Sequence, residues 1–86
     1  MSGRVYAGRR AIEQGSLEHE HVLLLAELSR INSQRVISAL DDYLAEGLSR
    51  KEACENNDVS QGYFSITLRK LLETHEIVKH ITRYYK

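Results

Sequence analysis

The sequence predicts an all-α fold, a small helical bundle of about four to five helices that contains a helix-turn-helix. Three observations support this prediction. The 86 residues include no proline and only five glycines, so few positions interrupt a helix. Apolar residues recur at three- and four-residue steps in successive segments, as on one face of a helix. Serines precede several of these segments, where they can act as helix N-caps.

The first helix is expected over residues 17–29, within "SLEHEHVLLLAELSR". Ser16 is its predicted N-cap. The spacing of the apolar residues predicts a buried stripe of Leu17, Val22, Leu24, Leu25 and Leu28.

The second helix is expected over residues 34–46, within "INSQRVISALDDYLAEG". Gly47 provides a C-terminal stop, because glycine adopts the left-handed conformation that commonly ends a helix. The apolar stripe of this helix is Val36, Ile37, Leu40, Tyr43 and Leu44.

Two further helices are expected on either side of a short polar break. Ser49 and Glu52 in "SRKE" form a capping box, so a short third helix starts there and runs to Glu55 or Asn56. The residues "NND" compete with the backbone for hydrogen bonds and tolerate left-handed conformations, so the chain turns there. Ser60 then caps a fourth helix that runs to about Thr74. A fifth segment, residues 77–85, is expected to pack back over the others.

This pair of helices fits a DNA-reading unit, which needs a short helix, a turn of three or four residues and a second helix with one anchored face and one free face. At about 100° per residue, the anchored face of the fourth helix is Phe64, Thr67, Leu68, Leu71 and Leu72, with Tyr63 at its margin. The free face has Gln61, Gly62, Ser65, Ile66 and Arg69. Glutamine, serine and arginine can bond bases or phosphates, and glycine allows close approach of the backbone. Arg50 and Lys51 would lie near a phosphate strand.

The charge distribution divides the chain into a basic N-terminal arm, residues 1–16, which is expected to be mobile, and a single helical DNA-binding domain, residues 17–86. The arm holds three arginines and one glutamate, whereas residues 17–48 hold six acidic and two basic residues. Residues 49–86 hold seven basic and five acidic residues, so the net charge of zero conceals an acidic middle. A neutral total is unusual for a small DNA-binding module.

Several other classes of function are disfavoured by the composition. A single cysteine cannot form an intrachain disulfide, and the four histidines have no zinc-binding spacing, so no metal or other cofactor is expected. No histidine has an assigned catalytic partner, so the chain is not expected to be an enzyme. The longest apolar run, residues 22–26, is too short to span a membrane. These features indicate a cytoplasmic protein.

Four stretches resemble the PapB family of fimbrial adhesin transcription regulators. They are "INSQRVISALDDYL" at 31–44, "SRKEACE" at 49–55, "GYFSITL" at 62–68 and the tyrosine pair at 84 and 85. The similarity extends in register from about Leu23 to Tyr85, whereas residues 1–16 show no clear correspondence.

The resemblance implies a helical DNA-binding domain that forms homo-oligomers on AT-rich double-stranded DNA near fimbrial promoters, bound to the nucleoid. It also implies DNA-binding roles for Arg50 and Cys54, although the residue pattern alone makes Cys54 a small buried hydrophobe. Family members use the minor groove, whereas the helix-face argument favours the major groove, so the groove stays open. The alternative function is a helical protein–protein interaction module without DNA binding, with the acidic region 17–48 as its binding face. The full predicted DNA-binding set is Arg50, Lys51, Cys54, Ser60, Gln61, Gly62, Ser65, Arg69 and Lys70.

Overall fold

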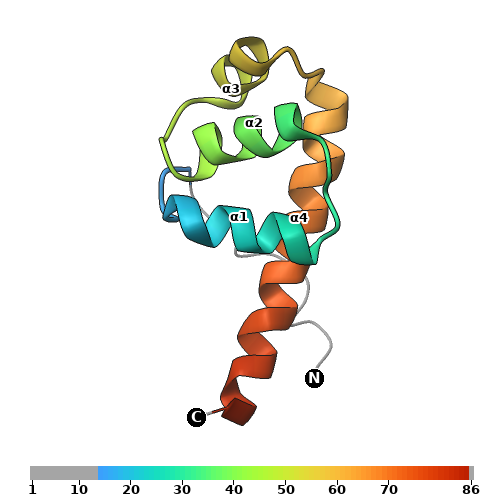
Figure 1. The fold of residues 1–86 in the computed structure, drawn as a ribbon. Coiled ribbons are helices and arrows are strands. Elements are labelled where there is room, and N and C mark those ends of the chain that lie inside the picture. Colours follow the sequence, from blue (N-terminus) through green and yellow to red (C-terminus); the bar gives the residue numbers. More distant parts are fainter. Residues whose placement is uncertain (1–13, 86) are drawn as a thin grey trace.

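The computed structural model describes residues 14–85, and these residues form four α-helices and one short 3₁₀ helix without strands. The elements are α1 (His19–Leu28), α2 (Gln34–Leu44), α3 (Arg50–Asn57), α4 (Gln61–Thr82) and η2 (Arg83–Tyr85). Helices α1 and α2 lie side by side and antiparallel, α3 packs on α2, and α4 crosses the ends of α1 and α2 (Figure 1). The predicted all-α fold is confirmed.

Serine caps start three of the four α-helices, and the caps of α3 and α4 were predicted. Ser33 and Ser60 accept hydrogen bonds from the backbone amides of Val36 and Tyr63, at 3.3 and 3.2 Å. Ser49 forms the expected capping box at the start of α3. The predicted N-cap of α1, Ser16, was wrong. Glu18 occupies the N-cap position, and its side chain makes no capping hydrogen bond.

Left-handed residues end α1 and α3 although neither is glycine. Arg30 has φ 60° and Asp58 has φ 56°. After each of them the next amide bonds back five residues, from Ile31 to the Ala26 carbonyl and from Val59 to the Cys54 carbonyl, both at 3.0 Å. These bonds satisfy carbonyls that the helix end would otherwise leave without a partner.

The core lies where the four helices meet. It is an apolar cluster formed by Val22, Leu25, Ala26, Ile31, Val36, Ala39, Leu40, Leu44, Ala53, Cys54, Phe64, Leu68 and Leu71. The stripe predicted for α2 is confirmed in this cluster and its margin. The stripe predicted for α1 was partly wrong, because Leu24 and Leu28 are exposed while Ala26 is buried. The buried residues of α1 are still three and four positions apart, but they lie on a side of the helix that is rotated from the predicted one.

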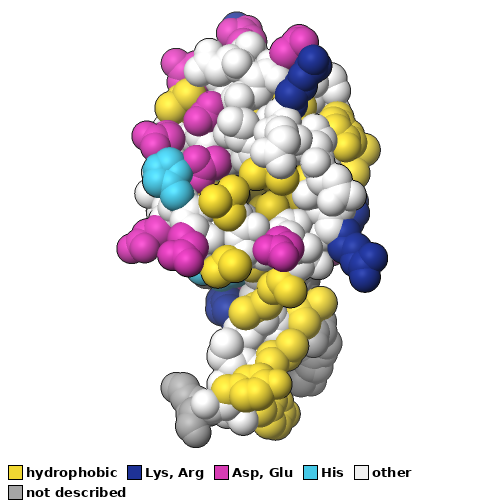
Figure 2. All heavy atoms as spheres, viewed as in Figure 1, with side chains coloured by type: hydrophobic (Ala, Val, Ile, Leu, Met, Phe, Trp, Pro, Cys, Tyr) yellow, Lys and Arg dark blue, Asp and Glu magenta, His cyan; other side chains and the backbone are white. Residues whose placement is uncertain are grey.

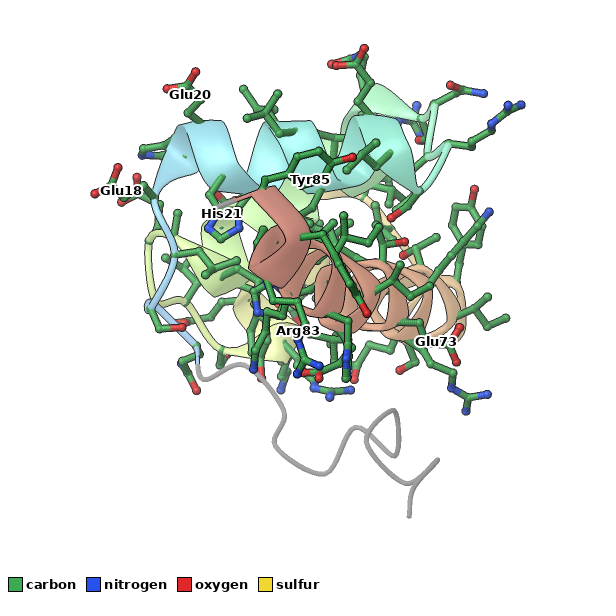
Figure 3. All side chains as sticks on the ribbon, turned by 90° about the horizontal axis from the view of Figure 1, so that it is seen from below. Glu18, Glu20, His21, Glu73, Arg83 and Tyr85 are labelled. Carbon is green, nitrogen blue, oxygen red and sulfur yellow. The ribbon has the colours of Figure 1, made fainter. Side chains whose placement is uncertain are left out.

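The predicted fourth and fifth helices are one continuous helix, α4, of 22 residues. Residues 74–77 include neither glycine nor proline, so nothing there stops a helix. The expectation that residues 77–85 pack back over the bundle was wrong. Val78 still packs against the core, but Ile77, Ile81, Tyr84 and Tyr85 are exposed. The end of α4 projects from the bundle, with Tyr85 and Arg83 on different sides of it (Figures 1 and 3).

Residues 14–17, here called the N-terminal strap, bind the C-terminal end of α2. The amides of Gly15 and Leu17 donate to the carbonyls of Tyr43 and Leu44, both at 3.0 Å. The Gln14 side chain donates to the carbonyl of Gly47 at 2.8 Å. Of the predicted arm, residues 1–13 lie outside the described residues, and residues 14–16 belong to this strap.

Candidate nucleic-acid interface

Helices α3 and α4 form the predicted bihelical unit, joined by a three-residue turn at 58–60. The unit is fixed to α2 at its turn end, where Asn57 donates both to the Asp42 carboxylate and to the Ala53 carbonyl, each at 2.8 Å. Buried Phe64, Thr67, Leu68 and Leu71 hold α4 against the core. The free face of α4 is therefore set at a defined angle to the start of α3.

Arg50 is the best-positioned cation of the predicted set. It is exposed on the first turn of α3, and its Nη1 donates to the Ser65 hydroxyl on α4 at 3.4 Å. The guanidinium carbon lies 5.7 Å from the centre of the Tyr43 ring, within the range of a cation–π contact. Arg50 thus connects three helices while its charge stays in contact with solvent. Lys51, the next residue, is also exposed.

Tyr43 was not among the predicted site residues. Its ring meets the Phe64 ring edge to face, with centres 5.7 Å apart and planes at 88°, and this contact fixes the ring beneath Arg50. The sequence contained a signal for this role, because Tyr43 has a polar tip at the margin of the α2 apolar stripe. Only the packing of α3 on α2 shows that the ring meets an arginine.

Gln61, Ser65 and Arg69 are exposed and follow one another at four-residue steps, so they share one side of α4, here called the polar face. Gly62 lies at its edge, and a Cβ atom at this position would meet nothing within 4 Å. The glycine is thus not required by any contact within the described residues. It leaves room for the backbone of α4 to approach a ligand.

The remaining predicted residues lie elsewhere. The Ser60 hydroxyl caps α4, and Lys70 lies about 100° around the helix from Arg69, outside the polar face. Cys54 is only 2% exposed, and burial raises the pKa of its thiol while the Arg50 charge opposes that shift. The interpretation of Cys54 as a small buried hydrophobe is confirmed. Any effect of Cys54 on DNA binding would act through the packing of α3.

Part of the acidic charge of residues 17–48 lies at an edge of the bundle away from α4. Carboxylates gather around a histidine at the opposite edge of α1 and α2 (Figure 2). There His19 bridges two helix ends, with Nδ1 2.6 Å from Asp41 and Nε2 2.8 Å from Glu46. The hydrogen bonds and charges of these acids, Asp41 first, raise the pKa of His19. This separation keeps the charges of Asp41 and Glu46 away from the polar face.

The described residues contain neither a candidate metal site nor a candidate membrane-spanning helix. Between residues 14 and 85, no three His, Cys, Asp or Glu side chains group as a metal would require. In the same part of the chain, no helix has both the length and the apolar character needed to cross a bilayer.

The described residues form a small all-α protein, in which a capped short helix is followed by a three-residue turn and a second helix with an outward polar face. The chain belongs to the PapB family, whose model is described as adhesin biosynthesis transcription regulatory protein and matches residues 4–85. The resemblance found in the sequence is confirmed, and the family is one of transcription regulators.

Individual relatives agree with this assignment. The chain is 44% identical over 71 residues to the major pilus subunit operon regulatory protein PapB of Escherichia coli, which covers 83% of this chain and 68% of PapB. It is 39% identical over 71 residues to the F1845 adhesin operon regulatory protein of E. coli, covering 83% and 84% of the two chains. The crystal structure of E. coli FocB superposes with a TM-score of 0.85 at 39% identity, over 99% of this chain and 100% of that one.

Proposed function

We propose that this chain regulates an adhesin operon by binding double-stranded, AT-rich promoter DNA through α3 and α4, as a homo-oligomer and without a cofactor. The observation that supports this proposal is the position of Arg50. Its charge is exposed at the start of α3, its Nη1 bonds Ser65 at 3.4 Å, and Tyr43 fixes the guanidinium. An arginine held this way loses little side-chain entropy when it meets a phosphate or a base.

In this proposal the two helices have different tasks. Arg50 and Lys51, beside the free amides at the start of α3, contact the phosphate backbone. Gln61, Ser65 and Arg69 contact base edges. The protein acts in the cytoplasm, on the nucleoid. Oligomerisation compensates for the neutral net charge, because adjacent weak subunits bind with a high effective concentration.

The test is retardation of a labelled AT-rich fimbrial promoter fragment in a gel, repeated over a range of salt concentrations. We expect retardation at low salt and an affinity that falls steeply with salt, because binding releases counterions from the DNA. A folded sample that retards no fragment at low salt would refute the proposal. It would favour the alternative function, a protein-interaction module.

Variants separate the two tasks. Arg50→Ala should weaken binding to all sequences and flatten the dependence on salt. Arg69→Ala should instead change the ranking of different promoter sequences. Ser65→Ala should change the ranking and also weaken binding in general, because it removes the hydroxyl that Arg50 bonds. Glu55→Ala, on the last turn of α3, serves as a surface control. Uniform losses for all three site variants would remove base reading from the proposal but keep DNA binding. Competition with a minor-groove ligand tests which groove is used.

A further inference from the structure

The projecting end of α4 carries a group of basic side chains that the proposal above does not use. Lys79 and Arg83 are exposed, and His80 lies partly buried beside them. These three residues, here called the basic end, line an open hollow of about 220 Å³ together with Glu76. In Figure 1 this part of α4 lies beyond the other described helices. The basic end therefore faces solvent rather than the bundle.

The basic end lies on the same side of α4 as the polar face. At about 100° per residue, Lys79 and Arg83 fall in the sector of about 80° that the polar face occupies, and His80 falls about 20° outside it. Between the two groups, only Leu72 and Glu76 point into that sector, and Leu72 is partly buried. The polar face and the basic end are thus two parts of one side of a single helix.

The charge of the basic end is available to an external anion. Figure 3 shows Arg83 on the side of the molecule opposite Glu18 and Glu20. Within the hollow, the Glu76 carboxylate lies 3.7 Å from the Lys79 ammonium, whose side chain is 58% exposed. Such an exposed pair contributes little to stability, so Lys79 can exchange this carboxylate for another anion at small cost.

We propose that the basic end contacts the phosphate strand that borders the groove occupied by the polar face. This inference rests on the proposed function and adds a second phosphate contact to it. A helix rises about 1.5 Å per residue, so Lys79 lies about 15 Å beyond Arg69, and Arg83 about 21 Å beyond it. The major groove is about 12 Å wide and the minor groove about 6 Å. When α4 crosses either groove, the basic end therefore lies past its edge, where the sugar-phosphate strand runs.

This contact places cations on both borders of the groove. Arg50 and Lys51 meet one strand from the start of α3, and the basic end meets the other strand from the end of α4. Phosphate contacts on two sides fix the register of a protein on the duplex without reading sequence. The basic end therefore sets affinity and salt dependence, whereas the choice of base sequence stays with the polar face.

The first test measures the slope of log affinity against log salt by fluorescence anisotropy of a labelled promoter fragment. Lys79→Gln and Arg83→Gln should each reduce the slope by about one and weaken binding about three- to tenfold at about 0.1 M salt, because each removes one phosphate contact. The ranking of promoter sequences should not change. Glu76→Gln should instead strengthen binding at least about twofold, because it frees Lys79 and removes a charge that repels phosphate.

Two control variants separate charge from position and from helix stability. Arg30→Gln makes the same change of charge elsewhere: the neighbouring Ser29 bonds Thr74 at 2.8 Å, and Thr74 lies about 180° around α4 from Arg83. Lys79→Arg keeps the cation, which also favours the C-terminal end of a helix, and should bind like the unmodified chain. Affinities are compared at a temperature at which circular dichroism shows equal helix content.

The outcomes distinguish this inference from the proposed function. If the unmodified chain retards DNA but Lys79→Gln and Arg83→Gln lose no more affinity than Arg30→Gln, the inference is overturned and the function stands. An equal loss for Lys79→Arg and Lys79→Gln would also overturn it, because charge would not be the cause. An unmodified chain that retards no DNA removes both.

The second test locates the contact with a photo-crosslinker attached to Lys79→Cys. Cys54 is only 2% exposed, so the reagent labels the new thiol. We expect crosslinks to the strand that flanks the base pairs whose preference Arg69→Ala changes, and none from the same reagent on Arg30→Cys. Crosslinks confined to those base pairs, or equal crosslinking from both positions, would refute the inference.

Discussion

At the scale of single residues, the environment of Arg50 decides what this arginine can do. An arginine on an exposed helix usually samples many rotamers, and holding it in one costs entropy. Here the Tyr43 ring and the Ser65 hydroxyl restrict it before any ligand arrives. In the proposed function, the same charge on an unsupported side chain would bind DNA more weakly.

Tyr43 therefore provides a test of how Arg50 is held. Tyr43→Phe keeps the ring and should change DNA affinity by less than about twofold, whereas Tyr43→Leu should weaken it about three- to fivefold, the loss of one exposed cation–π contact. Affinities are measured by fluorescence anisotropy below the melting temperature of each variant, since Leu also removes the ring contact with Phe64. Equal affinities for the Phe and Leu variants would show that the ring does not hold Arg50.

The His19 bridge predicts a dependence of stability on pH. Both ring nitrogens face carboxylates, so the doubly protonated imidazolium fits best and the folded-state pKa lies above 6.5. The stabilisation is complete below the unfolded-state pKa and is lost as the pH rises through the folded-state value. His19→Gln should therefore lower the melting temperature in mildly acidic buffer and leave it nearly unchanged in alkaline buffer.

The comparison with the unmodified chain must be made at each pH separately. His75 has its pKa lowered mainly by burial and also by nearby His21, so both proteins lose stability for this reason on acidification. Only the difference between them reports His19. A difference that grows with pH would contradict the bridge.

At the scale of elements, the turn between α3 and α4 depends on a residue in an uncommon conformation. Asp58 has φ 56°, where a side chain costs energy that glycine avoids. Its contact with Arg35, at 3.3 Å, joins two exposed groups and contributes little. The turn is therefore a place where the chain can gain stability.

Asp58→Gly is expected to raise the free energy of unfolding by roughly 0.5 kcal/mol, because glycine adopts the left-handed conformation without strain. Glu55→Gly, within the last turn of α3, should lower it by about 1 kcal/mol as glycine does in helices generally. Urea denaturation followed by circular dichroism measures both. Stabilisation by Glu55→Gly, or destabilisation by Asp58→Gly, would show that the left-handed backbone at position 58 does not reduce the stability of the fold.

The sequence predicted elements well where local signals exist. The predicted serine caps at 49 and 60 and the stripe of α2 are local features, and the structure contains them. Ser33 also caps α2, although it was not predicted as a cap. Arg30 ends α1 in a left-handed conformation that its residue type gives no reason to expect. Leu24 and Leu28 are exposed because of the positions at which α2 and α4 pack on α1. These positions cannot be predicted from the sequence of α1 alone.

In the candidate site, too, the local features could be predicted from the sequence and the tertiary contacts could not. The shared side of Gln61, Ser65 and Arg69 follows from the helical period alone. The contacts of Arg50 with Ser65 and Tyr43 join residues from three helices, so only tertiary packing reveals them. Lys70 is adjacent to Arg69 in sequence, but the same helical period turns it about 100° away from Arg69 and outside the polar face.

At the scale of the whole molecule, the N-terminal strap closes the bundle at the end of α2. Gly15 and Gly47 meet there, both with positive φ, and a Cβ on Gly15 would lie 3.2 Å from the Gly47 Cα. The backbone of Gly47 thus crowds the space that a side chain on Gly15 would need.

Gly15→Ala should therefore lower the free energy of unfolding by about 1–2 kcal/mol, through strain at positive φ and the close contact. Gly62→Ala is the matched control, since it lies in a helix with open space around it and should raise stability by up to about 1 kcal/mol. Thermal and urea denaturation of both variants measure these values. A Gly15→Ala chain as stable as the unmodified one would mean that the strap does not contribute to the fold.

The continuity of α4 has a mechanical consequence. A helix of 22 residues is a stiff rod about 33 Å long, and here one end bears the polar face while the other projects beyond the bundle. Tilting the projecting end must swing the opposite end, because no glycine or proline between them acts as a hinge. In the proposed function, a molecule that binds only the last turns of α4 would thus change how the polar face meets DNA.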